Sequence, residues 1–429
     1  MKISTAKKGL VGEVWVPGDK SISHRALILG ALAEGVTEIE NFLEAKDTLA
    51  TLNCLKKFGV RITKGNLKVK VHGTNQEFTE PQDILNAQNS GTTMRLLAGV
   101  AASFPFVTIF TGDKSLRRRP MKRILEPLSQ MGAKVFGRLG DEFAPFAVKG
   151  SSLSGRDFTL KKASAQVKSA ILLAGLRASG TTTVTEPGLS RDHTERMLES
   201  FGVKLKRGNN TVELFGGQKL RGQKVIVPGD FSSAAFFLVA ALIVPQSHLI
   251  IKNVGLNPTR TGLLTVLKEM GGDLKVLNYR ENSGEPVGDI EVKSSVLRAV
   301  EVPPDMVPAM IDEFPILAAA MAHAQGASIV RGAEELRVKE SDRIKSIVAE
   351  FSKMGVAIEE LPDGFKIIGG KKLKGTVVDS HHDHRIAMTL AVLGLTASQT
   401  TEILNAKAVS ISYPDFFLKL QNLLKERNS

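Results

Sequence analysis

The chain has 429 residues, which is too long for one ordinary hydrophobic core and favours two domains of about 200 residues each. Apolar residues make up 42% and charged residues 24%, as in globular proteins in water, and no apolar run is long enough for a transmembrane helix. The net charge of +13 favours an anionic partner, while one Trp and two Tyr are too few for stacking platforms that bind single-stranded nucleic acid.

The first predicted helix follows a Pro-Gly turn, and its apolar run begins at Ala26. Asp19 or Ser21 is suited to cap its start. Lys20 and Arg25 place two cations about one helical turn apart, where backbone N–H groups already favour an anion. The residues before this turn lack the apolar core of a signal peptide, so we expect a cytoplasmic protein.

A helix end followed by glycine and then by a strand recurs along the chain. These glycines are Gly59, Gly132, Gly202, Gly271 and Gly355. Their spacing of about 70 residues predicts six small α/β units, three per domain, the sixth ending in a helix from about Asp415 to Lys425 without a glycine. The single cysteine, Cys54, excludes an internal disulfide, suits a reducing compartment and is interpreted as a core residue of the first such helix.

The turn at 16–19 has a second copy at 227–230, about half a chain length later. Phe231 and Phe236 stand in the second copy where the first has Lys20 and Arg25, so we expect the anion-binding chemistry of this turn in the first copy alone. The two turns predict hinges near 17–20 and 228–231. They give a first domain of residues 20–228 and a second domain of residues 1–19 and 229–429.

Three further polar segments of the first domain are candidates for ligand contact. Gly91 precedes an apolar helix and would allow a ligand close to the backbone, although the segment 89–95 also fits an ordinary helix cap. The loop 112–120 is rich in cations, and Pro120 predicts an extended Arg119 that faces an anion, the alternative being a solvated basic surface. The segment 164–168 predicts a helix with a hydroxyl cap and an amide, and Asp192 is predicted as an N-cap.

The second domain has three charged segments. Asp312 and Glu313 interrupt an apolar stretch, which is costly for a carboxylate unless it is paired or functional. The segment 337–343 alternates in charge and fits either a salt-bridged helix face or a site. The segment 381–385 holds three His, but adjacent helical side chains diverge, so we expect no metal and instead a helix capped by Asp383 that presents Arg385 to an anion.

Taken together, these segments resemble the enolpyruvyl transferases, and within them the branch that acts on shikimate 3-phosphate. The matching stretches span nearly the whole chain in order and are 18–25, 89–95, 119–121, 164–166, 337–343 and 383–385. The resemblance implies an α/β fold of two domains, an inside-out α/β barrel with three βαβαββ units per domain. It also implies transfer of the enolpyruvyl group of phosphoenolpyruvate to the 5-hydroxyl of shikimate 3-phosphate, by addition and elimination through a tetrahedral intermediate in the interdomain cleft.

The resemblance further implies a role for individual residues. Those that hold shikimate 3-phosphate are Lys20, Ser21, Arg25, Ser164, Ala165, Gln166, Arg191, Asp312 and Lys339. Those that hold phosphoenolpyruvate are Lys20, Gly91, Arg119, Gln166, Arg343 and Arg385. Asp312 takes the proton from the 5-hydroxyl, Glu340 protonates the methylene carbon, and Lys20 assists the departure of phosphate. No metal or organic cofactor is implied, and the expected partners are the two small substrates, with no nucleic acid, no membrane and a monomeric chain.

Two alternatives remain beside this interpretation. The related branch that acts on UDP-N-acetylglucosamine carries a loop cysteine in many members, and Lys114 occupies that position here, which disfavours it. A basic nucleic-acid-binding repeat protein would explain the net charge and predicts salt-dependent retention of DNA or RNA. This second alternative assigns no role to the carboxylates of Asp312 and Glu340, which would lie near an anionic partner.

Overall fold

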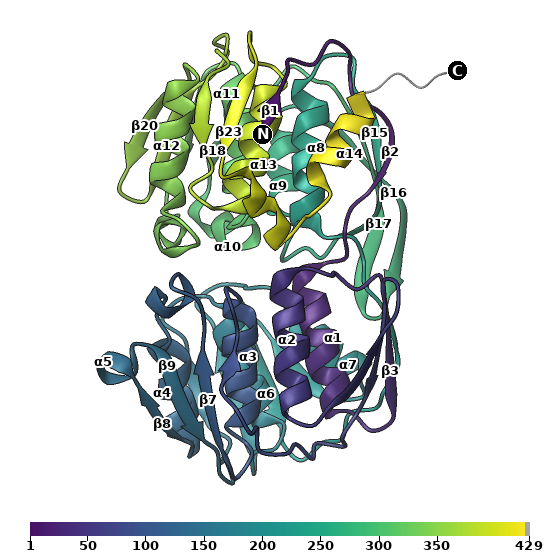
Figure 1. Ribbon diagram of the computed structural model, residues 1–429, viewed down its shortest axis with the longest axis vertical. Helices are drawn as coiled ribbons and strands as arrows, with labels where there is room; N and C mark the ends of the chain where they lie inside the picture. The colour runs from purple at the N-terminus through teal and green to yellow at the C-terminus, as the bar shows by residue number, and fades with distance from the viewer. Residues whose placement is uncertain (425–429) are drawn as a thin grey trace. The chain divides into compact units, whose positions relative to one another are not determined.

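The computed structural model describes residues 1–424, and its internal contacts divide the chain into two compact units (Figure 1). The first unit comprises Gly18–Val227 together with Glu281–Glu285. The second unit comprises Met1–Pro17, Pro228–Arg280 and the chain from Pro286 onwards. We expected residues 281–285 in the second domain; they group with the first because Glu285 pairs with His193 at 2.8 Å in a buried contact.

The strands of the first unit form four-stranded sheets in which one outer strand is parallel to its neighbour and the other pairs are antiparallel. One sheet has the order β14 (Lys224–Ile226), β3 (Val36–Glu40), β5 (Lys68–His72), β4 (Arg61–Lys64). The next has the order β6 (Leu85–Asn86), β7 (Val107–Thr111), β9 (Phe143–Lys149), β8 (Lys134–Gly137). The last has the order β10 (Asp157–Thr159), β11 (Thr181–Thr185), β13 (Thr211–Phe215), β12 (Leu205–Gly208).

The second unit repeats this pattern, with one smaller sheet. One sheet has the order β16 (Asp273–Asn282), β17 (Glu285–Lys293), β15 (His248–Gly255), β2 (Val11–Trp15). Another has the order β18 (Glu301–Val302), β19 (Ala327–Val330), β21 (Gly364–Ile368), β20 (Ala357–Leu361). The three-stranded sheet has the order β1 (Lys2–Ile3), β23 (Thr401–Leu404), β22 (Val377–Asp379). Residues 1–424 therefore contain six sheets, in agreement with the six predicted units.

Each of the two related turns carries the chain from a strand of one unit into a helix of the other. Strand β2 pairs with β15 of the second unit and leads through Gly18 into the first unit, while β14 pairs with β3 and leads through Gly229 into the second. Gly18 is required at its turn because a β-carbon there would lie 2.0 Å from the carbonyl oxygen of Asn41.

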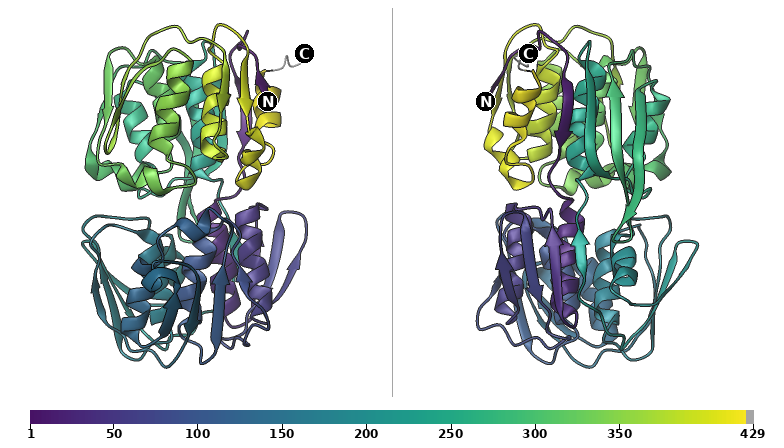
Figure 2. Two further views of the ribbon diagram at one scale, coloured as in Figure 1. Left: turned by 60° about the vertical axis from the view of Figure 1, so that its left-hand side comes forward. Right: turned by 90° about the vertical axis from the view of Figure 1, so that its right-hand side faces the viewer.

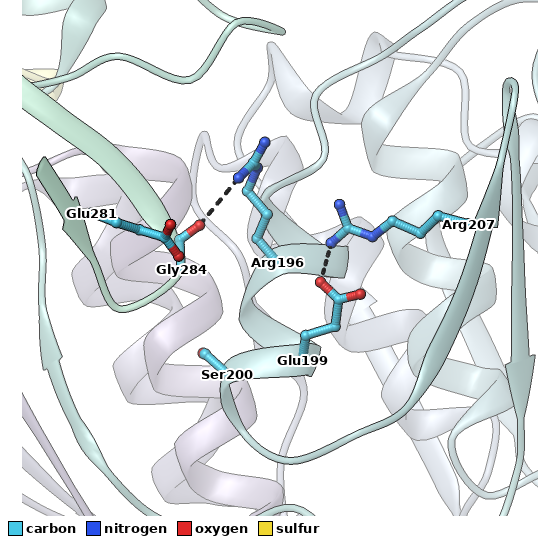
Figure 3. A pocket seen from close by; sticks show the side chains of 6 residues that line it. All are labelled: Arg196, Glu199, Ser200, Arg207, Glu281 and Gly284. Carbon is cyan, nitrogen blue, oxygen red and sulfur yellow. Dashed lines mark hydrogen bonds and ion pairs between the residues drawn. The ribbon is translucent and has the colours of Figure 1, made fainter.

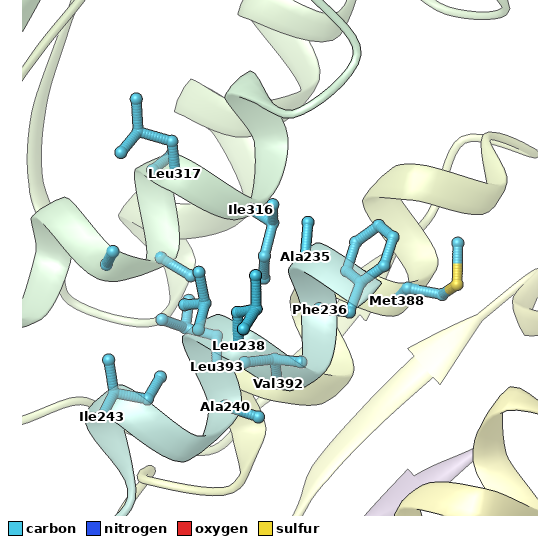
Figure 4. Close-up of a cluster of buried hydrophobic side chains, with 14 of the residues drawn as sticks. Ala235, Phe236, Leu238, Ala240, Ile243, Ile316, Leu317, Met388, Val392 and Leu393 are labelled. Carbon is cyan, nitrogen blue, oxygen red and sulfur yellow. The ribbon is translucent and has the colours of Figure 1, made fainter. Parts of the chain in front are cut away.

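Helices that are buried on nearly all sides form the centre of each unit. In the first unit these are α1 (Lys20–Leu32), α3 (Gly91–Ala101) and α6 (Ala165–Gly175). In the second unit they are α8 (Phe231–Ile243), α11 (Phe314–His323) and α13 (His384–Gly394). Phe236 and Leu238 of α8 lie with Ile316 of α11 and Val392 of α13 in one buried cluster (Figure 4). The sheets lie around these helices, and the views of Figure 2 show the long β16–β17 hairpin in teal and green.

The remaining helices are mostly amphipathic. They are α2 (Lys46–Lys57), α4 (Lys122–Met131), α7 (His193–Ser200), α9 (Gly262–Glu269), α12 (Arg343–Lys353) and α14 (Phe416–Leu424), with the short α5 (Arg138–Asp141) and α10 (Val307–Met310). Short 3-10 helices are η1 (Leu116–Arg118), η2 (Pro304–Met306), η3 (Glu334–Val338) and η4 (Ala406–Ile411). The five repeat glycines follow α2, α4, α7, α9 and α12 with positive φ, which confirms the predicted helix ends. The predicted final helix is α14; Lys425 lies outside the described residues.

Within residues 1–424, no helix combines the length and the apolar content that crossing a bilayer requires.

Candidate active site

In the first unit, the N-terminal ends of several helices come together. Arg25 of α1 donates from Nη2 to Ser169 Oγ of α6 at 2.8 Å, and Arg95 of α3 donates from Nη1 to Gln166 Oε1 of α6 at 2.5 Å. Thr93 of α3 donates to the backbone oxygen of Asp47 at the start of α2. Because each helix N-terminus carries partial positive charge and unpaired N–H groups, this end of the unit attracts anions.

The helix α1 begins as the sequence predicts. Asp19 is the N-cap, and its Oδ1 accepts from the N–H of Ile22 at 2.9 Å. Lys20 is the first helical residue, and its Nζ lies 3.2 Å from Asp47 Oδ2 with the Lys20 side chain 21% exposed. A partly exposed ammonium at a helix start is available to a small anion, and Asp47 holds it in place.

Arg25 is buried and fixed by three hydrogen bonds. Besides Ser169, it contacts Thr194 Oγ1 through Nε at 2.6 Å and the Ser21 carbonyl oxygen through Nη1 at 3.0 Å. Burial lowers the pKa of Arg25 to about 10, although the charges of Glu195 and Asp19 oppose this shift. The guanidinium therefore stays charged at neutral pH and brings positive charge to the α1 start.

Gly91 is flanked by two guanidinium groups. A β-carbon at this position would lie 2.9 Å from Arg95 Nη1 and 3.6 Å from Arg119 Nη1, so the missing side chain leaves the backbone open beside both cations. Arg119 has the extended conformation predicted from Pro120, with φ −85° and ψ 139°. Its Nη2 donates to Asn89 Oδ1 at 3.1 Å, which brings the basic loop to the start of α3.

Two predicted caps differ from the structure. Ser164 and Asp192 occupy the N-cap positions of α6 and α7, but neither side chain caps its helix. The N–H of Ser164 donates to Glu186 Oε1 at 2.8 Å, and Asp192 instead pairs with Arg196 at 2.8 Å and Arg207 at 3.4 Å. The Asp192 carboxylate is thus engaged by arginines, one of them in α7 itself, instead of by the N–H groups at the start of the helix.

A buried ion triad beneath these helix ends was missed by the sequence reading. Lys168 Nζ lies 2.7 Å from Glu186 Oε2 and 2.7 Å from Glu195 Oε1, with all three side chains at most 5% exposed. Glu186 also accepts from Ser190 Oγ at 2.8 Å. The triad thereby ties together the segments that carry Ser164, Arg191 and Thr194. The apolar run around Lys168 was the available signal, since a lysine there must be paired.

In the second unit, Arg343 gathers three carboxylates. Its Nε donates to Asp383 Oδ2 at 2.8 Å, Nη2 lies 2.7 Å from Glu340 Oε2, and Nη1 lies 3.4 Å from Asp312 Oδ1. Arg343 is 1% exposed, Asp383 is fully buried, and Glu340 and Asp312 are each 19% exposed. Burial alone would lower the pKa of Arg343, but the three carboxylates raise it above its usual value.

Asp383 caps α13 as predicted, since its Oδ1 accepts from the N–H of Arg385 at 2.9 Å. Burial would raise the pKa of Asp383, but the charge of Arg343 outweighs this effect and holds it below the usual value. Arg385 donates from Nη1 to the Asp312 carbonyl oxygen at 3.2 Å. Within residues 1–424 no group of three or more His, Cys, Asp or Glu side chains is placed to hold a metal ion.

The segment 337–343 does not form a helix face. The 3-10 helix η3 ends at Val338 and α12 begins at Arg343, so Lys339 and Glu340 lie in the connection between them. Lys339 Nζ pairs with Glu335 Oε1 at 3.0 Å, whereas Glu340 turns to Arg343. The structure thus brings Asp312, Glu340, Arg343 and Arg385 into one cluster and places Lys339 in a separate ion pair.

The two clusters have different chemistry. The first unit supplies cations, hydroxyls, an amide and helix N-termini, which suit the binding of phosphate and carboxylate groups. Its predicted site residues are Lys20, Ser21, Arg25, Gly91, Arg119, Ser164, Ala165, Gln166 and Arg191. The second unit supplies two partly exposed carboxylates held by arginines, which suit proton transfer beside an anion.

A cavity of about 330 Å³ in the first unit contains none of the predicted site residues (Figure 3). It is lined by Arg196, Glu199, Ser200, Arg207, Glu281 and Gly284. Its arginines are already engaged, because Arg207 Nη2 lies 2.6 Å from Glu199 and Arg196 Nη1 donates to the Gly284 carbonyl oxygen at 3.2 Å. This cavity lies where the tip of the β16–β17 hairpin meets α7.

Comparisons with known proteins identify the family of the chain. The family model described as EPSP synthase (3-phosphoshikimate 1-carboxyvinyltransferase) matches residues 4–420. A 3-phosphoshikimate 1-carboxyvinyltransferase of Carboxydothermus hydrogenoformans is 76% identical over 422 residues, covering 98% of this chain and 99% of that protein. The Bacillus subtilis protein of the same name is 49% identical over 419 residues, covering 97% and 98%.

Solved structures show the same fold. EPSP synthase from Acinetobacter baumannii has a TM-score of 0.89 and 44% identity, covering 98% of this chain and 97% of that one. The enolpyruvyl transferase NikO from Streptomyces tendae, at 17% identity, has a TM-score of 0.79 over 98% and 96% of the two chains, which shows the fold alone. The predicted inside-out α/β architecture and the predicted branch are therefore confirmed. The chain belongs to the EPSP synthase (3-phosphoshikimate 1-carboxyvinyltransferase) family.

Proposed function

We propose that the protein carries out the reaction of its family with the two clusters described above. The 5-hydroxyl of shikimate 3-phosphate adds to C2 of phosphoenolpyruvate while the methylene carbon gains a proton. The resulting tetrahedral intermediate then loses phosphate and a methyl proton, which leaves the enolpyruvyl ether. The single observation that carries this proposal is the clustering of Glu340 and Asp312 around Arg343, because it joins two candidate proton-transfer groups to a fixed cation.

The first unit is proposed to hold most of shikimate 3-phosphate. Lys20 and Arg25 bring two cations to the start of α1, which suits a phosphate dianion. Ser164, Ala165 and Gln166 at the start of α6 offer a hydroxyl, backbone N–H groups and an amide to the remaining hydroxyls. Ser21 and Arg191 complete this set, and Asp312 and Lys339 are proposed to contribute from the second unit.

Phosphoenolpyruvate is proposed to be bound by residues of both units. Arg119 and Lys20 come from the first, with Gly91 and Gln166 beside them, and Arg343 and Arg385 come from the second. Two anionic substrates repel one another, so several fixed cations are needed to bring their reacting atoms together. Arg343 pairs with three carboxylates of the protein at 2.7 to 3.4 Å, whereas Arg385 lies 3.8 Å from the carboxylates of Asp312 and Glu313 and is the less tightly paired of the two.

The carboxylates are proposed to divide the proton transfers. Asp312 accepts the proton of the 5-hydroxyl, and Glu340 delivers a proton to the methylene carbon. Each is 19% exposed, so each is reachable by a substrate while its orientation is held by Arg343. Lys20 is proposed to stabilise the leaving phosphate, because its ammonium is a partly exposed point charge at the start of α1.

Release of inorganic phosphate from phosphoenolpyruvate tests the proposal. We expect release with shikimate 3-phosphate and none with UDP-N-acetylglucosamine, because Lys114 stands where many members of that branch have a cysteine. No release with the shikimate substrate would refute the proposed activity. We also propose a monomeric cytoplasmic enzyme, which light scattering of the purified protein and fractionation of cells can test.

A further inference from the structure

The start of α8, which follows the second copy of the Pro-Gly-Asp turn, is occupied by a carboxylate of the protein itself. Ser232 Oγ donates to Glu313 Oε1, and Asp230 caps the helix by accepting from the N–H of Ser232 at 3.2 Å. Glu313 is fully buried, although the sequence of this turn carries neither of the cations found in the first copy. A buried carboxylate is tolerated only with compensating charge and hydrogen bonds.

Arg260 supplies that charge from a different segment. Its Nη1 lies 3.1 Å from each oxygen of Glu313, its Nη2 donates to Ser232 Oγ and lies 3.5 Å from Asp230 Oδ1, and the side chain is 4% exposed. Arg260 lies in the connection between β15 and α9. The start of α8 therefore resembles the start of α1, because both combine a cation, a hydroxyl and a helix N-terminus. At the start of α8 the anion is the carboxylate of Glu313, a residue of the chain itself.

The clamped carboxylate adjoins two proposed site residues. Glu313 directly follows Asp312 in the chain and is the N-cap residue of α11. Arg385 Nη1 lies 3.8 Å from Glu313 Oε1 and donates to the Asp312 carbonyl oxygen at 3.2 Å. Fixing Glu313 therefore fixes both the backbone that presents Asp312 and the guanidinium of Arg385.

We infer that Glu313 is a positioning residue, a built-in anion at the start of α8 whose clamp by Arg260 and Ser232 orients Asp312 and Arg385 for the reaction. The catalytic part of this inference rests on the proposed function. Glu313 itself is too deeply buried to meet a substrate, so it acts through its neighbours.

The inference predicts that a small free anion can replace the side chain. In Glu313→Ala the truncation leaves Arg260, Ser232 and the start of α8 facing an empty space of carboxylate size. We expect formate or acetate, compared with chloride at equal ionic strength, to raise the Tm of Glu313→Ala by several degrees more than that of the unmodified protein. Formamide, which has nearly the shape of formate without its charge, should give no such rise, and Glu313→Leu, which fills the space, should not respond to formate.

Turnover gives the second measurement. We expect kcat of Glu313→Ala to fall at least tenfold, with KM for shikimate 3-phosphate changing by less than threefold, and formate to restore part of kcat in a saturable manner after correction for its effect on the unmodified protein. The absence of a formate-specific rise in the Tm of Glu313→Ala would overturn the inference that the start of α8 holds a built-in anion. A rise in Tm without recovery of kcat overturns the positioning role.

Two further outcomes remain decisive. If Glu313→Ala does not fold, Glu313→Gln keeps the volume and removes the charge; unchanged kcat in that variant overturns the inference, and a tenfold loss at unchanged KM for shikimate 3-phosphate supports it. If the unmodified protein shows no turnover, the proposed function fails, while the formate-dependent Tm still decides whether the start of α8 holds an anion.

Discussion

Lys168 Nζ lies 2.7 Å from Glu195 Oε1, with the two side chains 5% and 1% exposed, and the same ammonium contacts Glu186 at 2.7 Å. Burial alone would lower the pKa of Lys168, but the charges of Glu195 and Glu186 and their hydrogen bonds raise it above its usual value. The lysine therefore stays charged, and it links the starts of α6 and α7. Both ends carry residues proposed to bind shikimate 3-phosphate.

Replacing Lys168 by Met is expected to lower the free energy of unfolding by about 3–5 kcal/mol, because two buried carboxylates lose their counter-ion. It should also raise KM for shikimate 3-phosphate more than KM for phosphoenolpyruvate, since the triad supports the segments of Ser164 and Thr194. Urea denaturation and steady-state kinetics measure the two effects, and Lys168→Arg should restore part of each.

Lys206→Met is the matched control for this experiment. Lys206 pairs with Glu213 at 3.1 Å, but the two side chains are 79% and 37% exposed. A surface pair of this kind contributes about 0–1 kcal/mol. If the two lysine variants lose equal stability and show the same KM values, the buried triad does not have the supporting role assigned to it.

Arg119→Ala is expected to raise KM for phosphoenolpyruvate about 10- to 100-fold, because a charged hydrogen bond to a substrate is worth about 1.5–3 kcal/mol. KM for shikimate 3-phosphate should change little. Arg118→Ala, in the same basic loop and exposed, is the control and should behave like the unmodified protein. If Arg119→Ala and Arg118→Ala have equal KM values for phosphoenolpyruvate, Arg119 contributes only to the surface charge of the loop.

The local parts of this site could be predicted from the sequence. Asp19 and Asp383 cap α1 and α13 because a cap depends on residues two or three positions away, and Arg119 is extended because Pro120 follows it. The six units could be predicted because the helix end, the glycine and the strand that recur along the chain are adjacent in the sequence. Prediction failed at Ser164 and Asp192, whose side chains do not cap their helices; Asp192 pairs with Arg196 of the same helix instead.

Contacts between distant segments could not be predicted in the same way. Arg260 and Glu313 are 53 positions apart, and nothing near Arg260 distinguishes it from a surface arginine until the fold buries it. Apolar surroundings did indicate that Glu313 needs a partner, but several cationic residues were available to it. The grouping of the hairpin tip at 281–285 with the first unit could not be predicted for a related reason, because it involves the contact of Glu285 with His193, 92 positions away.

Glu340→Gln is expected to lower kcat about 10²- to 10⁴-fold, the usual contribution of a general acid or base, while both KM values change by less than threefold. The amide oxygen of Gln can still accept from Arg343, so the side chain should keep its place and lose only its ability to transfer a proton. Glu360→Gln, at a 41% exposed residue paired with Arg337, is the control. Parallel losses in kcat and in substrate affinity would argue for a binding role of Glu340 instead.

Cys54 is expected to be unreactive in the folded protein, because burial raises the pKa of its thiol to about 12 and the thiolate is the reactive form. Iodoacetamide at pH 8 should leave it unmodified and should leave turnover unchanged, whereas the protein in guanidinium chloride should be labelled fully. Loss of turnover on labelling under native conditions would mean that the thiol is accessible and close to the reaction.

His24 gives the stability of the protein a predicted pH dependence. Burial, with the charges of Lys20 and Arg25, lowers the pKa of His24 well below 6.5, so the folded protein keeps this imidazole neutral where the unfolded chain protonates it. The unfolded state then binds more protons as the pH falls below about 6.5, and the free energy of unfolding decreases. The stabilisation is complete above about pH 6.5 and is lost progressively toward the folded-state pKa.

Urea denaturation between pH 7 and pH 5 measures this effect. The unmodified protein should lose stability more steeply than His24→Gln, by at most about 1.4 kcal/mol per pH unit, the limit for one proton. Gln can keep a hydrogen bond to Thr51, which lies 2.7 Å from His24 Nδ1, so the variant should remain folded. Equal slopes in the unmodified protein and His24→Gln would show that this buried ring does not couple folding to protonation.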